Sequence, residues 1–390
     1  MRVALRTAAA CAAVGMAAIA AGEAQRTTQG LTQNVTASDP VSIRGNAVLT
    51  LLDGAPVLYD AAAGREMASF HGLHDPIYGL SLSPDGRRVV TTTSNSNSDF
   101  VPVPFRNEIQ MWDAASGKQL WQISAPRGWQ PQWSPDSRSV AFTREETTMW
   151  WDVGSGTRRT GNDGVVRFDD AGRTLAVIRK GDVRLLDAAS QRPRCEVGAG
   201  AAAQIKSPVF SPDGNALAAV VRFPQDASVP DYKARREVRV WSTNTCGELQ
   251  SFAIQADTFT ELSFAKDGQQ LLINLSRPAV AEIVDVRTGD VLKSFRPSPA
   301  EFVTDAQLSE DGRHLLLRTS YHKDRDRNSC SLWDVDAGLE LHRWDEGYDG
   351  QGCAGFTGDG RNVIVLQGHR SVQLWSATTG EIVRDSAAAH

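Results

Sequence analysis

The chain has 390 residues, of which 41% are hydrophobic and 22% charged, and its formal net charge is -5. The acidic balance argues against general affinity for nucleic acid, which requires a basic surface. The apolar content is sufficient for a packed core and excludes a largely disordered chain. Glycine and tryptophan are frequent and no long apolar run follows the N-terminal segment, so the composition favours many short strands over helices.

The N-terminal segment, residues 1–24, is predicted to be a cleaved signal peptide. Arg2 and Arg6 form a basic region, residues 7–21 are a short apolar run, and small residues suited to cleavage follow. An uncleaved anchor is the alternative, but this run is shorter than the ~20 residues that a membrane span needs. We therefore expect a periplasmic or secreted protein without a stable membrane span, and a polar lead-in over residues 25–40.

Removal of the signal segment removes Cys11 and leaves Cys195, Cys246, Cys330 and Cys353. An even number of cysteines in an exported chain suggests disulfides. Four free buried thiols are the alternative, because four cysteines are sparse for this length. No C-x-x-C pair exists, so neither a zinc site nor thioredoxin-type redox chemistry is well supported.

From residue 41 onward the chain repeats a hairpin turn. The stretch Val209–Val221 (VFSPDGNALAAVV) shows it in full: Pro212 presets φ, Asp213 can bond the nearby backbone, and Gly214 takes the left-handed position. Seven units carry a version of this turn. An apolar residue enters each turn, and we expect these residues to pack sheet against sheet. They are Leu82, Trp133, Phe168, Phe210, Phe264, Leu308 and Phe356.

A second motif ends a strand with an apolar or aromatic residue followed by Asp or Ser, and a later Gly supplies positive φ. It occurs eight times at an average spacing of about 45 residues, the period of four-stranded propeller blades. The carboxylate or hydroxyl caps the turn, so the motif is turn chemistry and not catalysis. Gln191 replaces the Gly in the fourth unit, and Gly247 is assigned to the fifth. The eight pairs are Tyr59-Asp60, Trp112-Asp113, Trp151-Asp152, Leu186-Asp187, Trp241-Ser242, Val284-Asp285, Trp333-Asp334 and Trp375-Ser376.

Together these residues resemble the WD40-like repeat family of β-propellers, in an exported bacterial-type form, over nearly the whole mature chain. Leu80–Gly117 and Val372–Gly380 stand close to the family pattern. The resemblance implies an all-β fold, with a single propeller of four-stranded antiparallel blades over residues 41–390. Eight blades are favoured over seven, which requires Gly45-Asn46 to make the first hairpin turn and Glu381–Arg384 to supply the last strand. The family's Gly-His dipeptide and buried Asp are not repeated, so its internal hydrogen-bond network is not expected in the family form.

In a blade with strands A to D, the A–B and C–D turns lie at one end and the B–C loop lies at the other. Three B–C loops are long, at residues 93–107, 222–237 and 319–329. Aromatic and basic side chains in such loops are the types that anchor interfaces. Solvated loops without a partner are the plainer interpretation. The candidate partner-binding residues are Phe100, Phe105, Arg106, Phe223, Tyr232, Lys233, Arg235, Arg236, Tyr321, His322, Lys323 and Arg325.

The same geometry predicts the cysteine pairing. Cys330 begins strand C of the seventh unit and Cys353 begins strand A of the eighth, so both lie toward the long-loop end of neighbouring blades. Cys195 and Cys246 follow the C–D turns of the fourth and fifth units. The expected disulfides are therefore Cys195–Cys246 and Cys330–Cys353.

The function predicted from these features is a non-catalytic scaffold that binds a protein or peptide, with no cofactor or metal; the oligomeric state is not indicated. His71 and His74 form an H-x-x-H pattern, but the spacing supplies neither a helix nor an acidic partner. No G-x-S-x-G elbow occurs. A quinoprotein-like dehydrogenase is the main enzyme alternative, since Trp112–Trp121 resembles that family's strand-ending motif, although the family's adjacent cysteine pair is absent. A metal-dependent, lactonase-type propeller is a further alternative.

Overall fold

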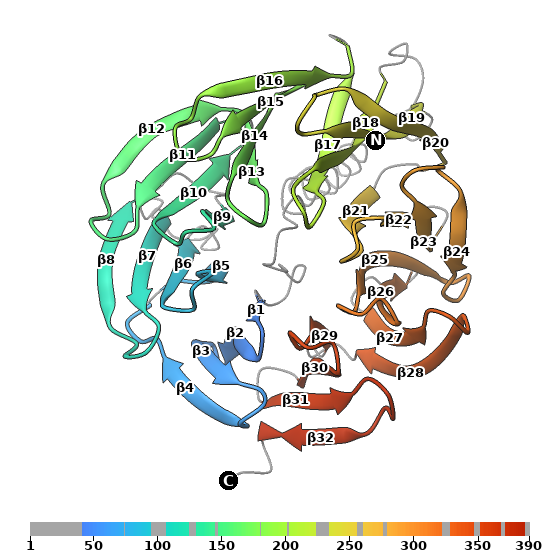
Figure 1. Cartoon of the computed structure of the whole chain (residues 1–390). Helices are drawn as coiled ribbons and strands as arrows, with labels where there is room; N and C mark the ends of the chain where they lie inside the picture. Colours follow the sequence, from blue (N-terminus) through green and yellow to red (C-terminus); the bar gives the residue numbers. More distant parts are fainter. Residues whose placement is uncertain are drawn as a thin grey trace, which may run out of the picture.

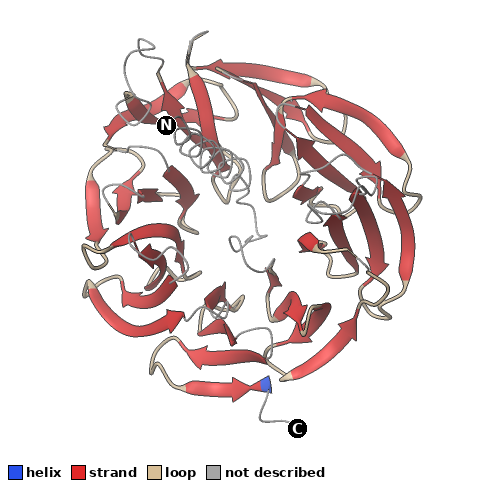
Figure 2. Ribbon diagram, turned by 180° about the vertical axis from the view of Figure 1, so that it is seen from behind, coloured by secondary structure: helices blue, strands red, loops and turns tan. Residues whose placement is uncertain are grey.

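The strands of the protein form a closed ring of blades. The computed structural model describes residues 41–386 except for 74, 95–106, 125–129, 145–146, 180, 201–202, 224–233, 256–259, 276–278, 322–327, 347–351 and 368–370. Within these residues, 32 strands form eight antiparallel sheets of four strands each. The sheets stand around a common axis as the blades of a propeller (Figure 1). Seen from behind, the described ring again consists of strands and the loops that join them, apart from a short helical turn at the end of β32 (Figure 2).

Each blade is built from four strands that are consecutive in the chain and paired in that order. Blades 1 to 4 contain β1 (Ser42–Arg44), β2 (Ala47–Leu52), β3 (Ala55–Asp60), β4 (Arg65–Ser69), β5 (Ile77–Leu82), β6 (Arg88–Ser94), β7 (Asn107–Asp113), β8 (Gln119–Ser124), β9 (Gln130–Trp133), β10 (Ser139–Arg144), β11 (Thr147–Asp152), β12 (Arg158–Asp163), β13 (Val165–Phe168), β14 (Thr174–Arg179), β15 (Asp182–Asp187) and β16 (Pro193–Gly198). Blades 5 to 8 contain β17 (Gln204–Phe210), β18 (Ala216–Arg222), β19 (Arg236–Ser242), β20 (Glu248–Ile254), β21 (Thr260–Phe264), β22 (Gln270–Leu275), β23 (Val280–Asp285), β24 (Val291–Phe295), β25 (Glu301–Leu308), β26 (His314–Tyr321), β27 (Asn328–Asp334), β28 (Leu339–Glu346), β29 (Gly352–Phe356), β30 (Asn362–Gln367), β31 (Ser371–Ser376) and β32 (Ile382–Asp385).

The preference for eight blades is confirmed at the two places where the repeat pattern is weakest. Gly45 and Asn46 form the turn between β1 and β2, where Arg44 pairs with Ala47. At the other end of the chain, β32 pairs with β31 and completes blade 8. Both terminal blades are therefore complete without borrowing a strand.

The A–B turns follow the predicted chemistry. In blade 5 the Gly214 amide donates to the Ser211 carbonyl at 2.8 Å, with Gly214 at φ 75°. The Asp213 carboxylate accepts the Ser211 hydroxyl at 2.6 Å and the Asn215 amide at 2.9 Å. The turn thus satisfies its own polar groups, which explains why a short local sequence can fix it.

One C–D turn assignment is wrong by one residue. Cys246, not Gly247, has positive φ (58°) in blade 5, and its amide donates to the Ser242 carbonyl at 2.9 Å. The spacing from Ser242 to Cys246 equals that from Asp113 to Gly117 in blade 2, so Cys246 is the equivalent turn residue. Gln191 occupies the same position in blade 4, also at φ 58°. The left-handed conformation therefore follows from the turn and not from the presence of glycine.

Eight apolar clusters in the described residues make up the core, and each one joins two consecutive blades. All seven residues that enter the A–B turns belong to these clusters or pack against them, as the sequence predicts. The cluster of Val41, Tyr59, Ile364 and Leu374, among others, joins blade 8 to blade 1. Burial between blades is therefore the force that closes the ring.

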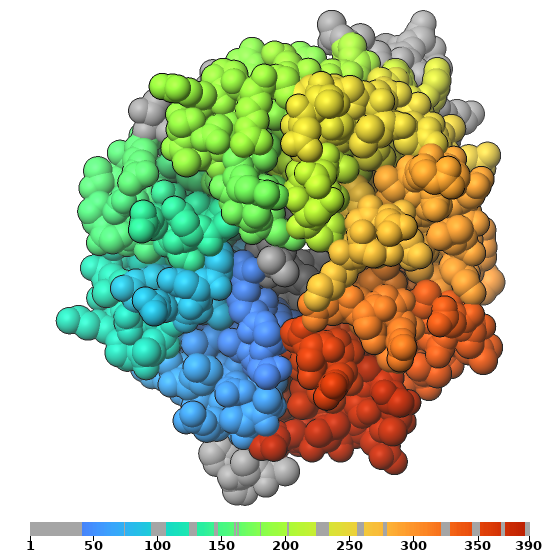
Figure 3. All heavy atoms as spheres, in the orientation of Figure 1, coloured from blue at the N-terminus to red at the C-terminus, as the bar shows by residue number. Residues whose placement is uncertain are grey.

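The seam between blades 8 and 1 contains no shared strand. Figure 3 shows the first blade (blue) lying directly beside the last (red). Beyond the apolar cluster, the Gly358 amide donates to the Gly45 carbonyl at 3.1 Å. The Arg384 guanidinium donates to the Ala63 carbonyl at 2.7 Å. Side-chain packing and a few hydrogen bonds thus hold the seam.

Hydrogen bonds within a blade differ from those of the family pattern, as the missing dipeptide suggests. In blade 2 the Trp112 indole donates to the Thr91 hydroxyl at 3.0 Å, and this hydroxyl donates to the Gln110 side chain at 3.0 Å. In blade 8 the Trp375 indole donates to Gln373, whose amide donates to Asp385. The indole acceptor is therefore the strand B residue Thr91 in blade 2 and the strand C residue Gln373 in blade 8.

Candidate functional site

The antiparallel order of the strands gives the ring two different faces. The A–B and C–D turns all lie on one, which we call the tight-turn face. The B–C ends of the strands lie on the other, which we call the long-loop face; the strand ends that flank the three long loops predicted at residues 93–107, 222–237 and 319–329 are on this face. Most of the predicted partner-binding residues lie outside the described residues. These are Phe100, Phe105, Arg106, Tyr232, Lys233, His322, Lys323 and Arg325.

Two of the predicted residues, Phe223 and Arg235, meet at the base of the second loop. The Phe223 amide donates to the Arg235 carbonyl at 3.0 Å, which extends the pairing of β18 with β19 beyond the strand ends. The Arg235 guanidinium carbon lies 4.9 Å from the centre of the Phe223 ring, and that of Arg239 lies 5.3 Å from it. Two cations thus contact one aromatic ring, an arrangement that stabilises the loop base by cation–π attraction.

Glu237 holds the two guanidinium groups in place. Its carboxylate pairs with Arg235 and accepts two hydrogen bonds from Arg239 at 3.2 Å each. The Arg235 side chain is 67% exposed, whereas those of Glu237 and Arg239 are 9% and 19% exposed. The Arg235 side chain is therefore exposed to solvent while its position is fixed by Glu237. We call Phe223, Arg235, Glu237 and Arg239 the loop-base cluster.

The other described candidates are placed differently. Arg236 is buried in β19, where its guanidinium donates to the Ala234 carbonyl at 3.1 Å. Tyr321 is the last residue of β26, and its side chain lies outside the description. Glu237 closes the predicted loop but was not singled out, and Arg239 was missed. The alternation of Arg235, Glu237 and Arg239 along one strand face was the available signal, because side chains two apart share a face.

A buried charge network stands at the base of the third loop. Glu301 is fully buried, and its carboxylate accepts the Ser298 amide at 3.0 Å, the Ser329 hydroxyl at 3.0 Å and the Arg343 guanidinium at 2.8 Å. Hydrogen bonds from Arg343 to Glu340, assisted by Glu301, raise the pKa of Arg343 above its usual range. Because every charge is paired, the network fixes the strand ends from which residues 322–327 depart.

The four cysteines form the two predicted pairs. Cys195 on β16 is bonded to Cys246 in the C–D turn of blade 5, with Cα atoms 6.3 Å apart. Cys330 on β27 is bonded to Cys353 on β29, with Cα atoms 6.0 Å apart. Each disulfide therefore joins two neighbouring blades, one pair on each face of the ring.

On the tight-turn face, one strand-D side chain of each of several blades holds the C–D turn of the next. The residue involved comes four positions after the positive-φ turn residue, and we call it a clasp residue. Trp121, Gln250, Lys293 and Arg384 each donate to a carbonyl of the next turn, at 2.8, 2.8, 2.8 and 2.7 Å. Cys195 occupies the same position in blade 4, and it contacts the turn of blade 5 through its disulfide bond to Cys246.

The clasp residues differ in how well they cover the turn that they reach. A Cβ atom added to Gly156 would lie 3.0 Å from the Trp121 ring, and one added to Gly380 would lie 3.2 Å from the His342 ring. One added to Gly338, in the turn that Lys293 reaches, would meet no atom within 4 Å. The thin Lys293 chain therefore touches its turn without covering it.

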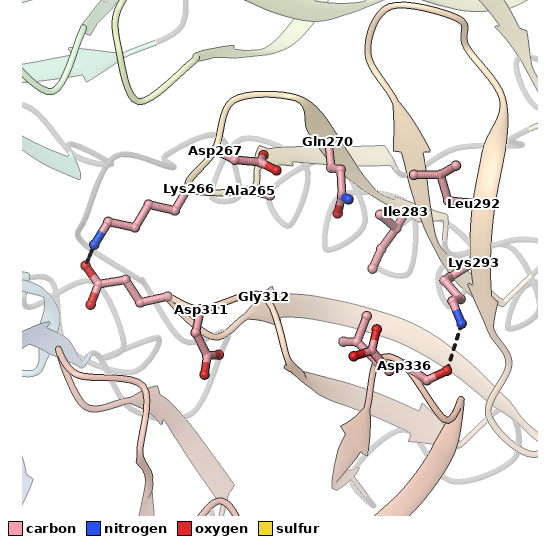
Figure 4. A pocket seen from close by; sticks show the side chains of 12 residues that line it. Ala265, Lys266, Asp267, Gln270, Ile283, Leu292, Lys293, Asp311, Gly312 and Asp336 are labelled. Carbon is pink, nitrogen blue, oxygen red and sulfur yellow. Dashed lines mark hydrogen bonds and ion pairs between the residues drawn. The ribbon is translucent and has the colours of Figure 1, made fainter.

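A cleft of about 540 Å³ opens at this interface, between blades 6 and 7 (Figure 4). Ala265, Ile283, Leu292 and Val335 supply its apolar lining. Gln270 and Ile283 project from one wall into the space, while Asp311 and Asp336 belong to the other. Lys266 pairs with Glu310 at one end, and Lys293 donates to the Asp336 carbonyl at the other. Nothing in the sequence reasoning singled out this cleft.

The described residues contain no group of three or more His, Cys, Asp or Glu side chains arranged to hold a metal ion. His71 is within hydrogen-bond distance of Ser69, at 3.0 Å, and His74 lies outside the description. A search of the described part of the chain for a helix long and apolar enough to cross a bilayer finds none.

Comparisons with known proteins agree with this fold. No family model matches the chain. A curated relative, the serine-threonine kinase receptor-associated protein of Gallus gallus, is 21% identical over 84% of this chain and 75% of its own length. Among solved structures, the C-terminal WD40 domain of Sif2 matches with a TM-score of 0.61 at 13% identity, over 83% of this chain and 90% of that one. A eukaryotic initiation factor matches with a TM-score of 0.56 at 15% identity, over 88% and 96%. The chain thus has the fold of a WD40-like β-propeller, with eight blades.

Proposed function

We propose that the protein is an exported, non-catalytic scaffold that binds a protein or peptide partner on its long-loop face. The observation that carries the proposal is the loop-base cluster. Phe223 and Arg235 are the residue types that dominate interface energetics, and the ion pair with Glu237 orders Arg235 before a partner arrives. Such ordering lowers the entropic cost of binding.

The comparisons support the same class of function without naming a partner. The curated relative is, by its name, associated with a serine-threonine kinase receptor. WD40-like propellers present rigid rims on which loops can vary, since a repeat scaffold tolerates insertions on one face. We take the long loops of blades 2, 5 and 7 as such insertions.

Export is part of the proposal and rests on two features. The basic and apolar N-terminal segment has the composition of a signal peptide. Two disulfides between neighbouring blades suit an oxidising compartment, because cytosolic proteins rarely keep structural disulfides. We therefore place the protein in the periplasm or outside the cell. Fractionation of cells expressing the full chain, with N-terminal sequencing of the product, tests this: cytosolic protein that retains Met1 would contradict it.

A capture experiment tests the binding role. Wild-type protein, a variant lacking residues 224–233, and the point variant Arg235→Ala are immobilised and exposed to periplasmic or culture-medium extract. The control is Arg287→Ala, which removes an arginine from a C–D turn on the opposite face. A partner retained by wild type and Arg287→Ala, but lost from both loop variants, supports the proposal. Equal retention by all four proteins refutes the assignment of the loop.

A further inference from the structure

We propose that the cleft between blades 6 and 7 is a second binding site, which takes an arginine side chain from a basic segment of a partner protein. The cleft lies on the tight-turn face, opposite the long loops, so this site is independent of the function proposed above. Two observations carry the inference. The cleft is partly apolar, and it lies beside the turn at Gly338, which its clasp residue Lys293 contacts but does not cover.

The first step is the missing side chain. At the blade 2–3 interface the clasp residue is Trp121, and at the blade 8–1 interface it is Arg384; each has a flat group that covers the next turn. Arg384 covers Gly64 and donates to the Ala63 carbonyl. At the blade 6–7 interface the clasp residue is Lys293, and the turn at Gly338 stays open. The contact of Arg384 with the turn at Gly64, between blades 8 and 1, is therefore an example within this protein of the contact that a partner's arginine would make in the cleft.

The second step is charge. Four carboxylates line the cleft, from Asp267, Glu310, Asp311 and Asp336, against the two ammonium groups of Lys266 and Lys293. Lys266 is paired with Glu310, and Lys293 is engaged with a backbone carbonyl. The Asp311 carboxylate accepts the Ser309 hydroxyl at 2.7 Å and the Arg313 amide at 3.1 Å, and the Asp267 carboxylate accepts the Gln269 amide at 2.8 Å. The Asp336 carboxylate has no hydrogen-bond partner among the described residues. The cleft is therefore complementary to a cation.

The third step is shape. A guanidinium is planar, donates in several directions and is only weakly hydrated, so it can lie against apolar groups while it pairs with carboxylates. Its methylene stem suits a wall built from Ile283, Leu292 and Val335. Leu292 is 47% exposed beside the cleft and gives an apolar neighbour of the arginine a surface to contact. A lysine would match the charge but would leave the turn uncovered, as Lys293 does.

The test uses the full-length mature protein and a fluorescein-labelled peptide amide, Gly-Ser-Leu-Arg-Gly-Arg-Leu-Ser-Gly, followed by fluorescence anisotropy. The comparison peptide has citrulline in place of both arginines, which keeps the shape and removes the charge. We expect saturable binding of the arginine peptide, and binding of the citrulline peptide weaker by about tenfold or more, because charge-assisted hydrogen bonds are lost. Equal binding of the two peptides, or none at millimolar concentration, overturns the proposal.

Variants then locate the site. Lys293→Trp places the blade 2 clasp residue in the cleft and should abolish binding, whereas Lys293→Ala leaves the cleft open and should preserve it. If the tryptophan variant does not fold, the pair Asp267→Asn and Asp336→Asn serves instead, with an expected loss of about tenfold. Asp85→Asn is the matched control, because Asp85 has the same turn role in blade 2, where no residue lines the cleft. Unchanged binding by Lys293→Trp, or by the double asparagine variant, refutes the site. Deletion of residues 224–233 should not affect this binding, so the two proposals can fail separately.

Discussion

Removal of the Cys195–Cys246 disulfide should destabilise the propeller by an amount set by chain length. The two cysteines are 51 residues apart, and the bond closes a loop that spans most of a blade and crosses one interface. In the chain-entropy account, a loop of this length contributes about 4 kcal/mol at 25 °C, against about 3.5 kcal/mol for the 23-residue separation of Cys330 and Cys353. Since domains are stable by only about 5–15 kcal/mol, either loss is a large fraction of the total.

Equilibrium unfolding in urea, followed by the fluorescence of the 10 tryptophans, measures the effect. The variant is Cys195→Ala with Cys246→Ala, which leaves no free thiol from the pair. Alanine, like cysteine, has a Cβ atom, so the backbone strain of the positive φ at position 246 is the same in both proteins. For an m-value of about 3 kcal/mol/M, the midpoint should fall by about 1.3 M. Wild type in excess dithiothreitol is the companion measurement. A fall in the midpoint of less than about 0.3 M would refute the reasoning, because it would show that the disulfide adds little to the stability that the apolar cluster between blades 4 and 5 already provides.

Three further predictions concern stability. Glu301→Ala should cost about 3 kcal/mol in urea unfolding, because it removes the fully buried carboxylate that accepts from Ser298, Ser329 and Arg343, while Glu301→Gln should cost less; equal costs for the two would contradict the network. Gly338→Ala should cost about 1 kcal/mol from its φ of 66° alone, and Gly156→Ala should cost more at the same φ because its Cβ would also meet Trp121 at 3.0 Å; a smaller loss at position 156 would argue against clasping by Trp121. Hydrogen bonds from the Ser211 hydroxyl and the Asn215 amide lower the pKa of Asp213 below 3.8, so the stability it contributes is present above that pH and is lost as pH falls through the lower folded value. Thermal unfolding between about pH 2 and 6 should therefore decline less steeply for Asp213→Asn than for wild type, and parallel curves would exclude the effect.

The repeating parts of the fold can be predicted from the sequence because their causes are local. Each A–B turn is satisfied by its own residues, as Ser211, Asp213 and Gly214 show. The cysteine pairing could also be predicted, since strand order alone brings Cys330 and Cys353 to the same end of adjacent blades. One residue was misassigned where the local rule was ambiguous: Gly247 follows Cys246, and the positive φ of Cys246 together with its hydrogen bond to Ser242 shows which of them makes the turn.

The functional sites depend on contacts that no single repeat contains. The approach of Phe223 to Arg239 requires the β18–β19 pairing to continue past Arg222, which the spacing of the loop does not specify. The cleft exists because the Lys293 side chain of blade 6 does not fill the space beside the C–D turn of blade 7. Aligning the repeats at the clasp position, where Trp121, Gln250, Lys293 and Arg384 correspond, would have been the nearest sequence signal.

The seam between blades 8 and 1 bears on how such a ring can change. Because β1 to β4 and β29 to β32 are each continuous in the chain, the seam is an ordinary interface that lacks only a connecting segment. Joining the two ends and opening the chain between any other pair of blades would leave every sheet intact. The architecture therefore permits circular permutation, and it permits gain or loss of a whole repeat, without any strand having to exchange partners.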